Sequence, residues 1–210
     1  MTSSCVIEDL SIEMLRKKDY ASVINYAIVG MHFDWYMSSK MVLKAYGKYF
    51  LYTELNRATQ VIAAYKGDEL AGVLLAEIKG EKPVHYSFFR HIYVRVFDVL
   101  QHLFAGGAVG AYDKANMKML ADYKKKAEVD GELIFLAANP DMRGKGVGTI
   151  LLEELIRREP GKRIYLFTDS ACTYQFYDNR GFDRVGERHV VLKLKRKRVP
   201  LDCYLYSRKL

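Results

Sequence analysis

Two periods of hydrophobic residues alternate along this 210-residue chain. Segments with the alternation or the short apolar runs of strands lie at 5–12, 60–65, 71–79, 133–138, 162–168, 184–195 and 201–206. Segments with the spacing of an amphipathic helix lie at 20–28, from 38 or 39 onward, and at 88–103, 116–128 and 150–158. Strands and helices that alternate in this way predict a single α/β domain over residues 1–210.

A strand followed by a glycine-rich bend and a helix is the clearest chemical signal in the sequence. From Gly144 to Gly148, glycine alternates with Lys145 and Val147, so the backbone can approach a ligand with few Cβ atoms in the way. The amides at the start of the following helix lie at the positive end of the helix dipole. Such an arrangement binds phosphate, and Arg143 at the mouth of the bend adds a positive charge.

Two common phosphate-binding motifs do not fit this bend. A Walker loop requires serine or threonine after the Gly-Lys pair, whereas Gly146 follows Lys145. A Rossmann fingerprint requires its last glycine where this chain has Thr149, and its first glycine directly after the strand. The remaining pattern is R-x-x-G-x-G, formed by Arg143, Gly146 and Gly148. It resembles the acetyl-CoA pyrophosphate loop of the GNAT acetyltransferase superfamily.

A second segment strengthens the resemblance. Phe176, Tyr177, Gly181 and Phe182 form an F-Y-x-x-x-G-F pattern that is similar to the second CoA-contacting segment of the same superfamily. The resemblance covers residues 131–187, the expected acetyl-CoA-binding core. It implies a mixed, mostly antiparallel sheet that is splayed at the CoA-binding strand and has helices on both faces.

The segment 81–130 departs from the family pattern, which usually has a short turn before the CoA-binding strand. This insert has helical periodicity and contains a lysine-rich helix. Three roles are open for it: a lid over the acceptor cleft, a dimer interface, or enlargement of the fold.

The resemblance implies direct transfer of an acetyl group from acetyl-CoA to a primary amine of a small molecule or peptide, without a metal. Two alternatives remain: a protein lysine or N-terminal amine as the acceptor, and a non-catalytic CoA-binding regulatory module. Tyr177 matches the tyrosine that protonates the leaving thiolate, with core packing as the alternative. Glu132, 11 residues before Arg143, matches a glutamate that serves as general base in the histone-acetylating branch. The alternatives for Glu132 are a water chain as the base and an exposed glutamate without a role.

The resemblance also implies the binding residues. The pantetheine arm is expected to contact the backbone of Leu136, Ala137 and Ala138. The pyrophosphate is expected to contact Arg143, Gly144, Lys145, Gly146, Val147 and Gly148. Ser170 stands where relatives often have an asparagine that binds pantetheine. The candidate acceptor contacts are Phe33, Asp34, Trp35 and Tyr36, for which aromatic packing between helices is the alternative.

Composition adds expectations about partners and compartment. The net charge of +8 favours an anionic partner such as CoA, although solubility alone also explains it. Nucleic acid is not expected, because no aromatic residues interrupt the basic run at 195–198. Three irregularly spaced cysteines indicate reduced thiols in the cytoplasm and no zinc site. No signal peptide or bilayer-spanning run is visible, so we expect no membrane partner, while a homodimer through the insert stays open.

Overall fold

A computed structural model describes residues 10–35, 37, 39–105, 110–142, 144–194 and 198–210. The strands are β1 (Leu10–Glu13), β2 (Gln60–Lys66), β3 (Glu69–Ile78), β4 (Gly131–Ala138), β5 (Arg163–Asp169), β6 (Asp183–Lys193) and β7 (Arg198–Lys209). The helices are α1 (Tyr20–Gly30), α2 (Lys40–Arg57), α3 (Phe88–Ala105), α4 (Ala111–Lys124), α5 (Val147–Arg158) and α6 (Gln175–Asp178). Single 3-10 turns are η1 (Lys17–Asp19), η2 (Phe33–Trp35) and η3 (Pro140–Met142).

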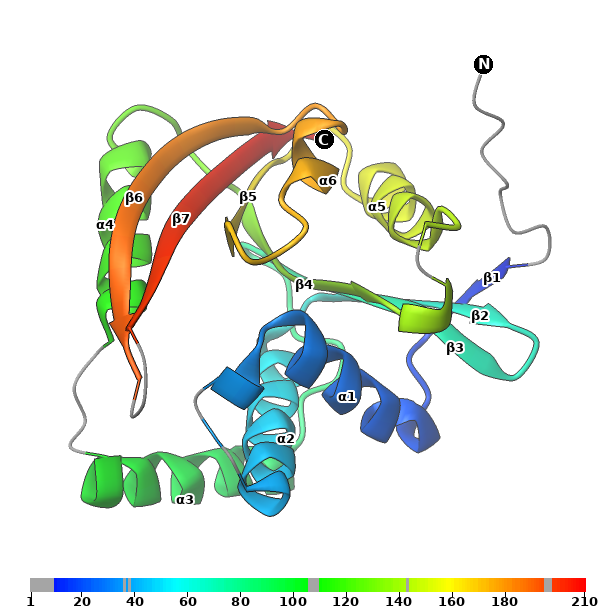
Figure 1. The fold of residues 1–210 in the computed structure, drawn as a ribbon. Helices are drawn as coiled ribbons and strands as arrows, with labels where there is room; N and C mark the ends of the chain where they lie inside the picture. The colour runs from blue at the N-terminus through cyan, green and yellow to red at the C-terminus, as the bar shows by residue number, and fades with distance from the viewer. Residues whose placement is uncertain (1–9, 36, 38, 106–109, 143, 195–197) are drawn as a thin grey trace. The chain divides into compact units, whose positions relative to one another are not determined.

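The described strands form one sheet of seven strands in the order β1-β2-β3-β4-β5-β7-β6 (Figure 1). Among the pairs with a described register, β4–β5 is parallel and the others are antiparallel. The mixed, mostly antiparallel α/β architecture is therefore confirmed. By its contacts the chain forms two compact units, one from residues up to 94 and 133–160, the other from 95–132 and 161–210.

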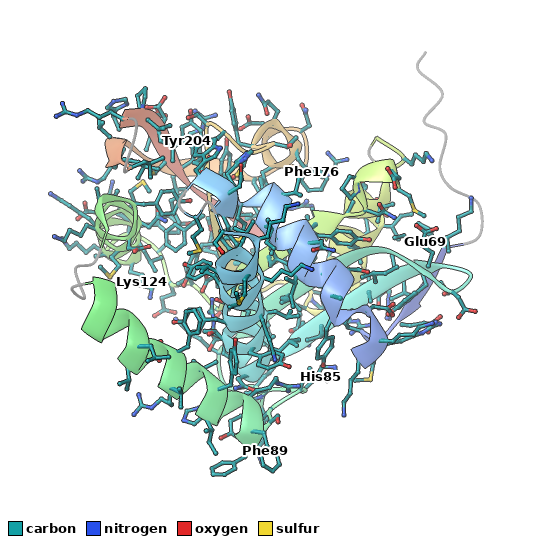
Figure 2. The ribbon with its side chains drawn as sticks, turned by 60° about the horizontal axis from the view of Figure 1, so that its bottom comes forward. Glu69, His85, Phe89, Lys124, Phe176 and Tyr204 are labelled. Atoms are coloured by element: carbon teal, nitrogen blue, oxygen red, sulfur yellow. The ribbon has the colours of Figure 1, made fainter. Side chains whose placement is uncertain are left out.

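The first unit packs helices on both faces of the hairpin formed by β2 and β3. On one face, Val61 and Val73 pack with Leu51 of α2 and Val23 of α1. On the other face lies α5, which contacts both strands (Figure 1). Burial on both faces explains why these strands are nearly continuous apolar runs rather than alternating ones. The hairpin turn precedes Glu69, at the right-hand side of the sheet in Figure 2.

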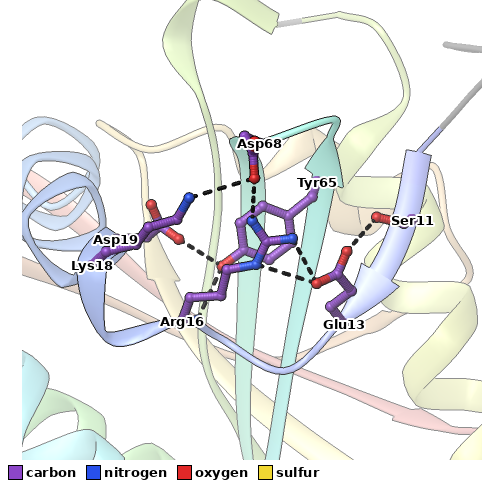
Figure 3. A network of polar contacts seen from close by, with 7 residues as sticks. All are labelled: Ser11, Glu13, Arg16, Lys18, Asp19, Tyr65 and Asp68. Carbon is purple, nitrogen blue, oxygen red and sulfur yellow. Dashed lines mark hydrogen bonds and ion pairs between the residues drawn. The ribbon is translucent and has the colours of Figure 1, made fainter.

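A polar network ties the segment before α1 to this hairpin (Figure 3). The Tyr65 hydroxyl donates to Asp19 Oδ2 at 2.9 Å and accepts from the Arg16 amide at 3.0 Å. The Arg16 guanidinium lies 4.1 Å from the centroid of the Tyr65 ring and pairs with Glu13 and Asp68. Asp19 occupies the N-cap position of α1, where an aspartate side chain commonly accepts from a first-turn amide. It makes no such bond, since its carboxylate accepts from Tyr65 instead.

Helix boundaries differ from the sequence prediction at two places. Helix α1 ends at Gly30, two residues beyond the predicted segment 20–28. Beyond this end, His32 has a positive φ of 53°. The helix expected at 116–128 is α4, which starts five residues earlier, at Ala111, and ends at Lys124. Its first turn places Tyr112 near Asp169 of β5, a contact that sequence spacing does not reveal.

The second unit is built on the antiparallel strands β5, β7 and β6, with the start of β4 paired in parallel to β5. Helix α4 packs against one face of these strands, where Met119 and Tyr123 contact Cys203 and Leu205. At a bulge in β6, a Cβ on Gly186 would lie 3.2 Å from Met119 Cβ, so glycine lets the helix approach closely. The second helix of the insert therefore supplies part of this unit's core.

Candidate functional site

The glycine-rich turn between β4 and α5 has the conformation that its composition requires. Gly144 and Gly146 have φ of 79° and 83°, in the left-handed region that favours glycine. A Cβ at either position would meet no atom within 4 Å, so the space beside this turn is open. Lys145 is exposed and Val147 is buried. Arg143 lies outside the described residues.

The N-terminus of α5 is suited to an anion. The amides of Thr149 and Ile150 donate to Gly146 O at 2.9 and 3.1 Å, which starts the helix. Within the part of the chain that the structure describes, the amides of Val147 and Gly148 donate to no protein acceptor. Such first-turn amides, at the positive end of the helix dipole, can donate to phosphate oxygens.

Asn139 anchors the start of this turn to the hairpin. Its amide donates to Ala71 O at 2.7 Å, and its side-chain Nδ2 donates to Glu69 Oε1 at 2.8 Å. Its Oδ1 accepts from the Asp141 amide at 3.1 Å, which holds the chain in a tight turn. Asn139 is buried, so these bonds fix the turn on β3. Sequence spacing does not reveal this contact between Asn139 and Glu69.

Gly72 of β3 allows the helix to approach the sheet closely. A Cβ there would lie 2.7 Å from Val147 Cγ1, 2.9 Å from Ala137 O and 3.1 Å from Leu151 Cδ1. Any side chain at position 72 would push the start of α5 away from the sheet. We did not identify Gly72 from the sequence, although a glycine inside an apolar strand is a known sign of close approach.

The pantetheine candidates Leu136, Ala137 and Ala138 occupy the last three positions of β4, each partly exposed. Ala137 O is the atom that faces Gly72. Together with the turn at 144–148, they form one continuous segment of the first unit.

The acceptor candidates lie between α1 and α2. Phe33 is buried and packs edge-on against Tyr46 and Phe50, with ring centroids 4.9 and 5.7 Å apart. Trp35 stacks on His32 at 4.5 Å between ring centroids, and Asp34 is exposed. Tyr36 lies outside the described residues. The positive φ of His32 is an uncommon conformation for a residue with a side chain, and such residues often occur at functional sites.

Tyr177 belongs to the second unit and lies on α6. Its ring packs edge-on against Phe176 and Phe182, at 5.2 and 5.5 Å between centroids. Burial raises the pKa of Tyr177 well above its usual range, with a smaller contribution from Cys172. The phenol is therefore protonated at neutral pH, as a general acid must be. The sequence pattern that joined these aromatic residues corresponds to one cluster in space.

Ser170 and Cys172 lie in the connection from β5 to α6. Ser170 Oγ accepts from the Asp202 amide at 3.1 Å, and the Ser170 amide donates to Asp202 O at 2.9 Å. These bonds attach the connection to β7. Burial, together with the nearby Asp169, raises the pKa of Cys172 to about 12. Cys172 is thus a thiol at neutral pH and not a nucleophile.

Glu132 lies on β4 in parallel register with Tyr165. Its Oε2 accepts from the Tyr165 hydroxyl at 3.4 Å, and the side chain is partly buried. The candidate residues therefore fall into two groups. The first unit holds the glycine-rich turn and the residues between α1 and α2, and the second holds Glu132, Ser170 and Tyr177.

Within residues 10–35, 37, 39–105, 110–142, 144–194 and 198–210, no group of three or more histidine, cysteine or acidic side chains could hold a metal ion. Over the same ranges, no helix has both the length and the apolar character to cross a bilayer.

The family model and the solved structures that match this chain are all acetyltransferases or share their fold. Residues 104–182 match the family model of the Acetyltransferase (GNAT) family. This range includes β4, the glycine-rich turn, α5, β5 and α6. No curated protein sequence matches the chain significantly.

Solved structures share the fold over nearly the whole chain. The histone acetyltransferase HPA2 and related acetyltransferase of Corynebacterium glutamicum is 17% identical, with a TM-score of 0.57 over 94% of this chain and 96% of that one. NAA60 of Arabidopsis thaliana, in complex with a bisubstrate analogue, is 13% identical, with a TM-score of 0.55 over 96% and 98%. The ribosomal-protein-S18-alanine N-acetyltransferase of Escherichia coli is 14% identical, with a TM-score of 0.53 over 95% and 92%.

Proposed function

We propose that the chain, whose residues 104–182 match the GNAT acetyltransferase family model, transfers an acetyl group from acetyl-CoA to a primary amine. The observation that carries this proposal is the open glycine-rich turn at the N-terminus of α5. Left-handed Gly144 and Gly146 leave space beside the backbone, and the amides that follow them can donate to the pyrophosphate of CoA. Arg143 would add its positive charge at the same turn.

The chemistry proposed is direct transfer, without a covalent acetyl-enzyme. A neutral amine attacks the thioester carbon, the C–S bond breaks, and CoA leaves as a thiolate that takes a proton. Amines are mostly protonated at neutral pH, so a base must first remove a proton, for which Glu132 or a water chain is the candidate. Holding both substrates in near-attack geometry supplies much of the rate enhancement.

Tyr177 is the proposed acid. Burial keeps its phenol protonated, so the proton is available when negative charge develops on sulfur. In β4, the backbone at Leu136, Ala137 and Ala138 is proposed to hold the pantetheine arm. A backbone N–H there would also polarise the thioester carbonyl. The free thiols of Cys172 and Cys203 are consistent with a reducing compartment, and we propose that the reaction takes place in the cytoplasm.

The proposed acceptor is the amine of a small molecule or a peptide. Among proteins with this fold, one acts on the alanine of ribosomal protein S18, and another is described as a phosphinothricin N-acetyltransferase. The fold thus serves both peptide and small-molecule amines, which supports a panel that contains both classes.

The binding test uses a matched pair of glycine variants. Gly146→Ala and Gly67→Ala both place a side chain on a backbone with positive φ in open space, but Gly67 lies in the β2–β3 turn. Each should lose about 1–2 kcal/mol of stability from left-handed strain. Calorimetry with acetyl-CoA should show binding to the wild type and to Gly67→Ala, and at least about tenfold weaker binding to Gly146→Ala.

Turnover is then measured as thiol release with small amines and with peptides that carry free N-termini or lysines. Release with small amines or short peptides supports the proposal, whereas release only with folded proteins favours the protein-acetylating alternative. Binding of acetyl-CoA without release from any acceptor would favour the regulatory module. A wild-type protein that fails to bind acetyl-CoA would contradict the proposal altogether.

A further inference from the structure

Helix α3 exposes a continuous row of large apolar side chains. Phe89 is 82% exposed, and Figure 2 shows it near the N-terminal end of α3, pointing away from the helix. The other large apolar residues exposed on this helix are Phe88, Ile92, Val96, Val99 and Leu100. We call these six residues the α3 apolar face.

The six residues share one side of the helix. At about 100° per residue, they fall within an arc of roughly 120°. Tyr93 lies beyond one edge of this arc and packs against α2, where its hydroxyl donates to Ala45 O at 3.4 Å and its ring meets Tyr52 edge-on. Residues 88–94 of α3 therefore turn one side to α2, while the six residues of the α3 apolar face are exposed.

An exposed apolar surface of this kind needs an explanation. Isolated apolar residues on a surface are ordinary, but a contiguous row of six on one helix marks an interaction surface. The core of the fold does not use these side chains, so their selection is not explained by folding.

The charges beside this face indicate what covers it. On α2, Lys40, Lys44 and Lys48 recur every fourth residue, and Lys48 Nζ lies 4.8 Å from the Tyr93 ring centroid. Arg90 extends over α2, with its Nε 3.3 Å from Asn56 Oδ1. No acid occurs between residues 40 and 53 of α2. The stretch of α2 that meets Tyr93 of α3 is thus basic.

Within α3 the balance is also positive. This helix has two arginines, Arg90 and Arg95, and one acid, Asp98. At about 100° per residue, Arg95 lies at the edge of the apolar arc opposite to Tyr93. An apolar face with cations along its sides is the pattern of helices that lie in the surface of an anionic membrane.

We propose that α3 docks in the plane of an anionic phospholipid bilayer. The apolar face enters the boundary between headgroups and acyl chains, while the lysines of α2 and the arginines of α3 bind lipid phosphates. A second copy of the chain is a poorer occupant, because each α3 helix has two arginines and one acid, so two copies side by side would bring together two net positive helices. This inference rests on α3 and α2 and does not depend on the proposed acetyl transfer.

The sequence analysis expected no membrane partner because no segment can span a bilayer. The structure agrees on that point for the described helices. Binding in the interface requires only one amphipathic helix, so the absence of a spanning segment does not argue against it.

The test is sedimentation of the full chain with vesicles of phosphatidylcholine, with and without phosphatidylglycerol. The wild type should bind vesicles that contain phosphatidylglycerol, and should bind less as salt rises. Phe89→Glu combined with Val96→Glu should weaken binding by at least about tenfold, because it buries charge at the apolar face. The control is Met117→Glu, which charges an exposed apolar residue on α4. It should bind like the wild type.

A further double variant and a folding control complete the test. Lys40→Glu combined with Lys44→Glu leaves the apolar face intact and should lower the affinity for vesicles at low salt only. Circular dichroism and thermal unfolding report whether each variant is folded. Absence of binding to phosphatidylglycerol vesicles, or binding that survives the Phe89→Glu/Val96→Glu change, would overturn the proposal. A dimer by light scattering that this double variant converts to monomer would overturn it too, in favour of a self-interface.

Discussion

Gly72 and Val147 touch across the first unit so closely that a Cβ on Gly72 would lie 2.7 Å from Val147 Cγ1. One residue is inside a strand, and the other is the first residue of the helix that follows the glycine-rich turn. The position of the proposed phosphate-binding amides at the start of α5 therefore depends on the absence of a side chain at position 72, which lies 75 residues before Val147 in the chain.

Replacing Gly72 by alanine should lower both stability and cofactor affinity. The new methyl group would also lie 2.9 Å from Ala137 O, a backbone atom that cannot move without distorting β4. Overpacking of this kind costs about 1–3 kcal/mol. We expect that loss in urea unfolding and a raised Kd for acetyl-CoA. Gly30→Ala is the control, because its Cβ would meet nothing within 4 Å and its φ is not positive. Unchanged affinity in Gly72→Ala would show that α5 does not need this contact.

Replacing Tyr177 by phenylalanine should slow the chemical step without weakening acetyl-CoA binding. The change removes the proposed proton donor but keeps the aromatic cluster with Phe176 and Phe182. Loss of a general acid lowers kcat by about 100-fold or more. The comparison is Tyr174→Phe, on the same short segment, whose ring packs against Tyr204. Single-turnover rates separate chemistry from product release. Equal rates in Tyr177→Phe and wild type would remove Tyr177 from the mechanism.

The protein should lose stability at alkaline pH, in part through Tyr65. Burial, with a smaller contribution from the Asp19 carboxylate and against an opposing effect of Arg16, raises the pKa of Tyr65 from 10.0 to about 12. Between these values the unfolded chain releases a proton that the folded chain retains. The free energy of unfolding therefore falls as pH rises from about 10 to 12.

Urea unfolding at a series of pH values measures this slope. In Tyr65→Phe the free energy of unfolding should decrease less steeply above pH 10 than in the wild type, because the variant has one fewer titrating group. The variant should also lose about 1–3 kcal/mol at neutral pH, since the Arg16 amide and the Asp19 carboxylate lose their partner. An identical alkaline slope in both proteins would show that Tyr65 ionises as readily in the fold as in the unfolded chain.

The protein should lose stability at acid pH in part through Glu154, whereas Tyr65 lowers its stability at alkaline pH. Hydrogen bonds from Arg157, followed by those from Arg158, lower its pKa from 4.5 to about 2. Its contribution is complete above about pH 4.5 and is lost as pH falls toward 2, because the unfolded chain binds the proton first. Thermal unfolding between pH 2 and 6 should show a weaker dependence in Glu154→Gln than in the wild type. Glu153→Gln, at the adjacent position of the helix, is the control.

Much of the fold could be predicted from the hydrophobic pattern alone. Strands β2 and β3 and the hairpin turn between them follow from two apolar runs separated by Lys66, Gly67 and Asp68. The glycine-rich turn before α5 could also be predicted from the sequence. Its backbone has positive φ at Gly144 and Gly146, a conformation that glycine adopts without strain and that depends on these residues alone. The family resemblance rested on such local patterns, which is why it was visible without a structure.

Contacts between residues that are far apart in the chain could not be predicted from the sequence. The Asp19 carboxylate could cap α1 or bind another group, and only the fold brings Tyr65 to it across 46 residues. The Asn139 amide meets Glu69 across 70 residues. Nothing near either residue in the sequence marks its partner.

What the sequence by itself determined is the set of elements, their order and the turn that can hold a pyrophosphate, because each depends on neighbouring residues. The tertiary structure alone decided which glycine lets α5 reach the sheet and which side of α3 stays outside. Both are questions of which surfaces meet, and an apolar residue such as Phe89 has the same helical period whether it is buried or exposed.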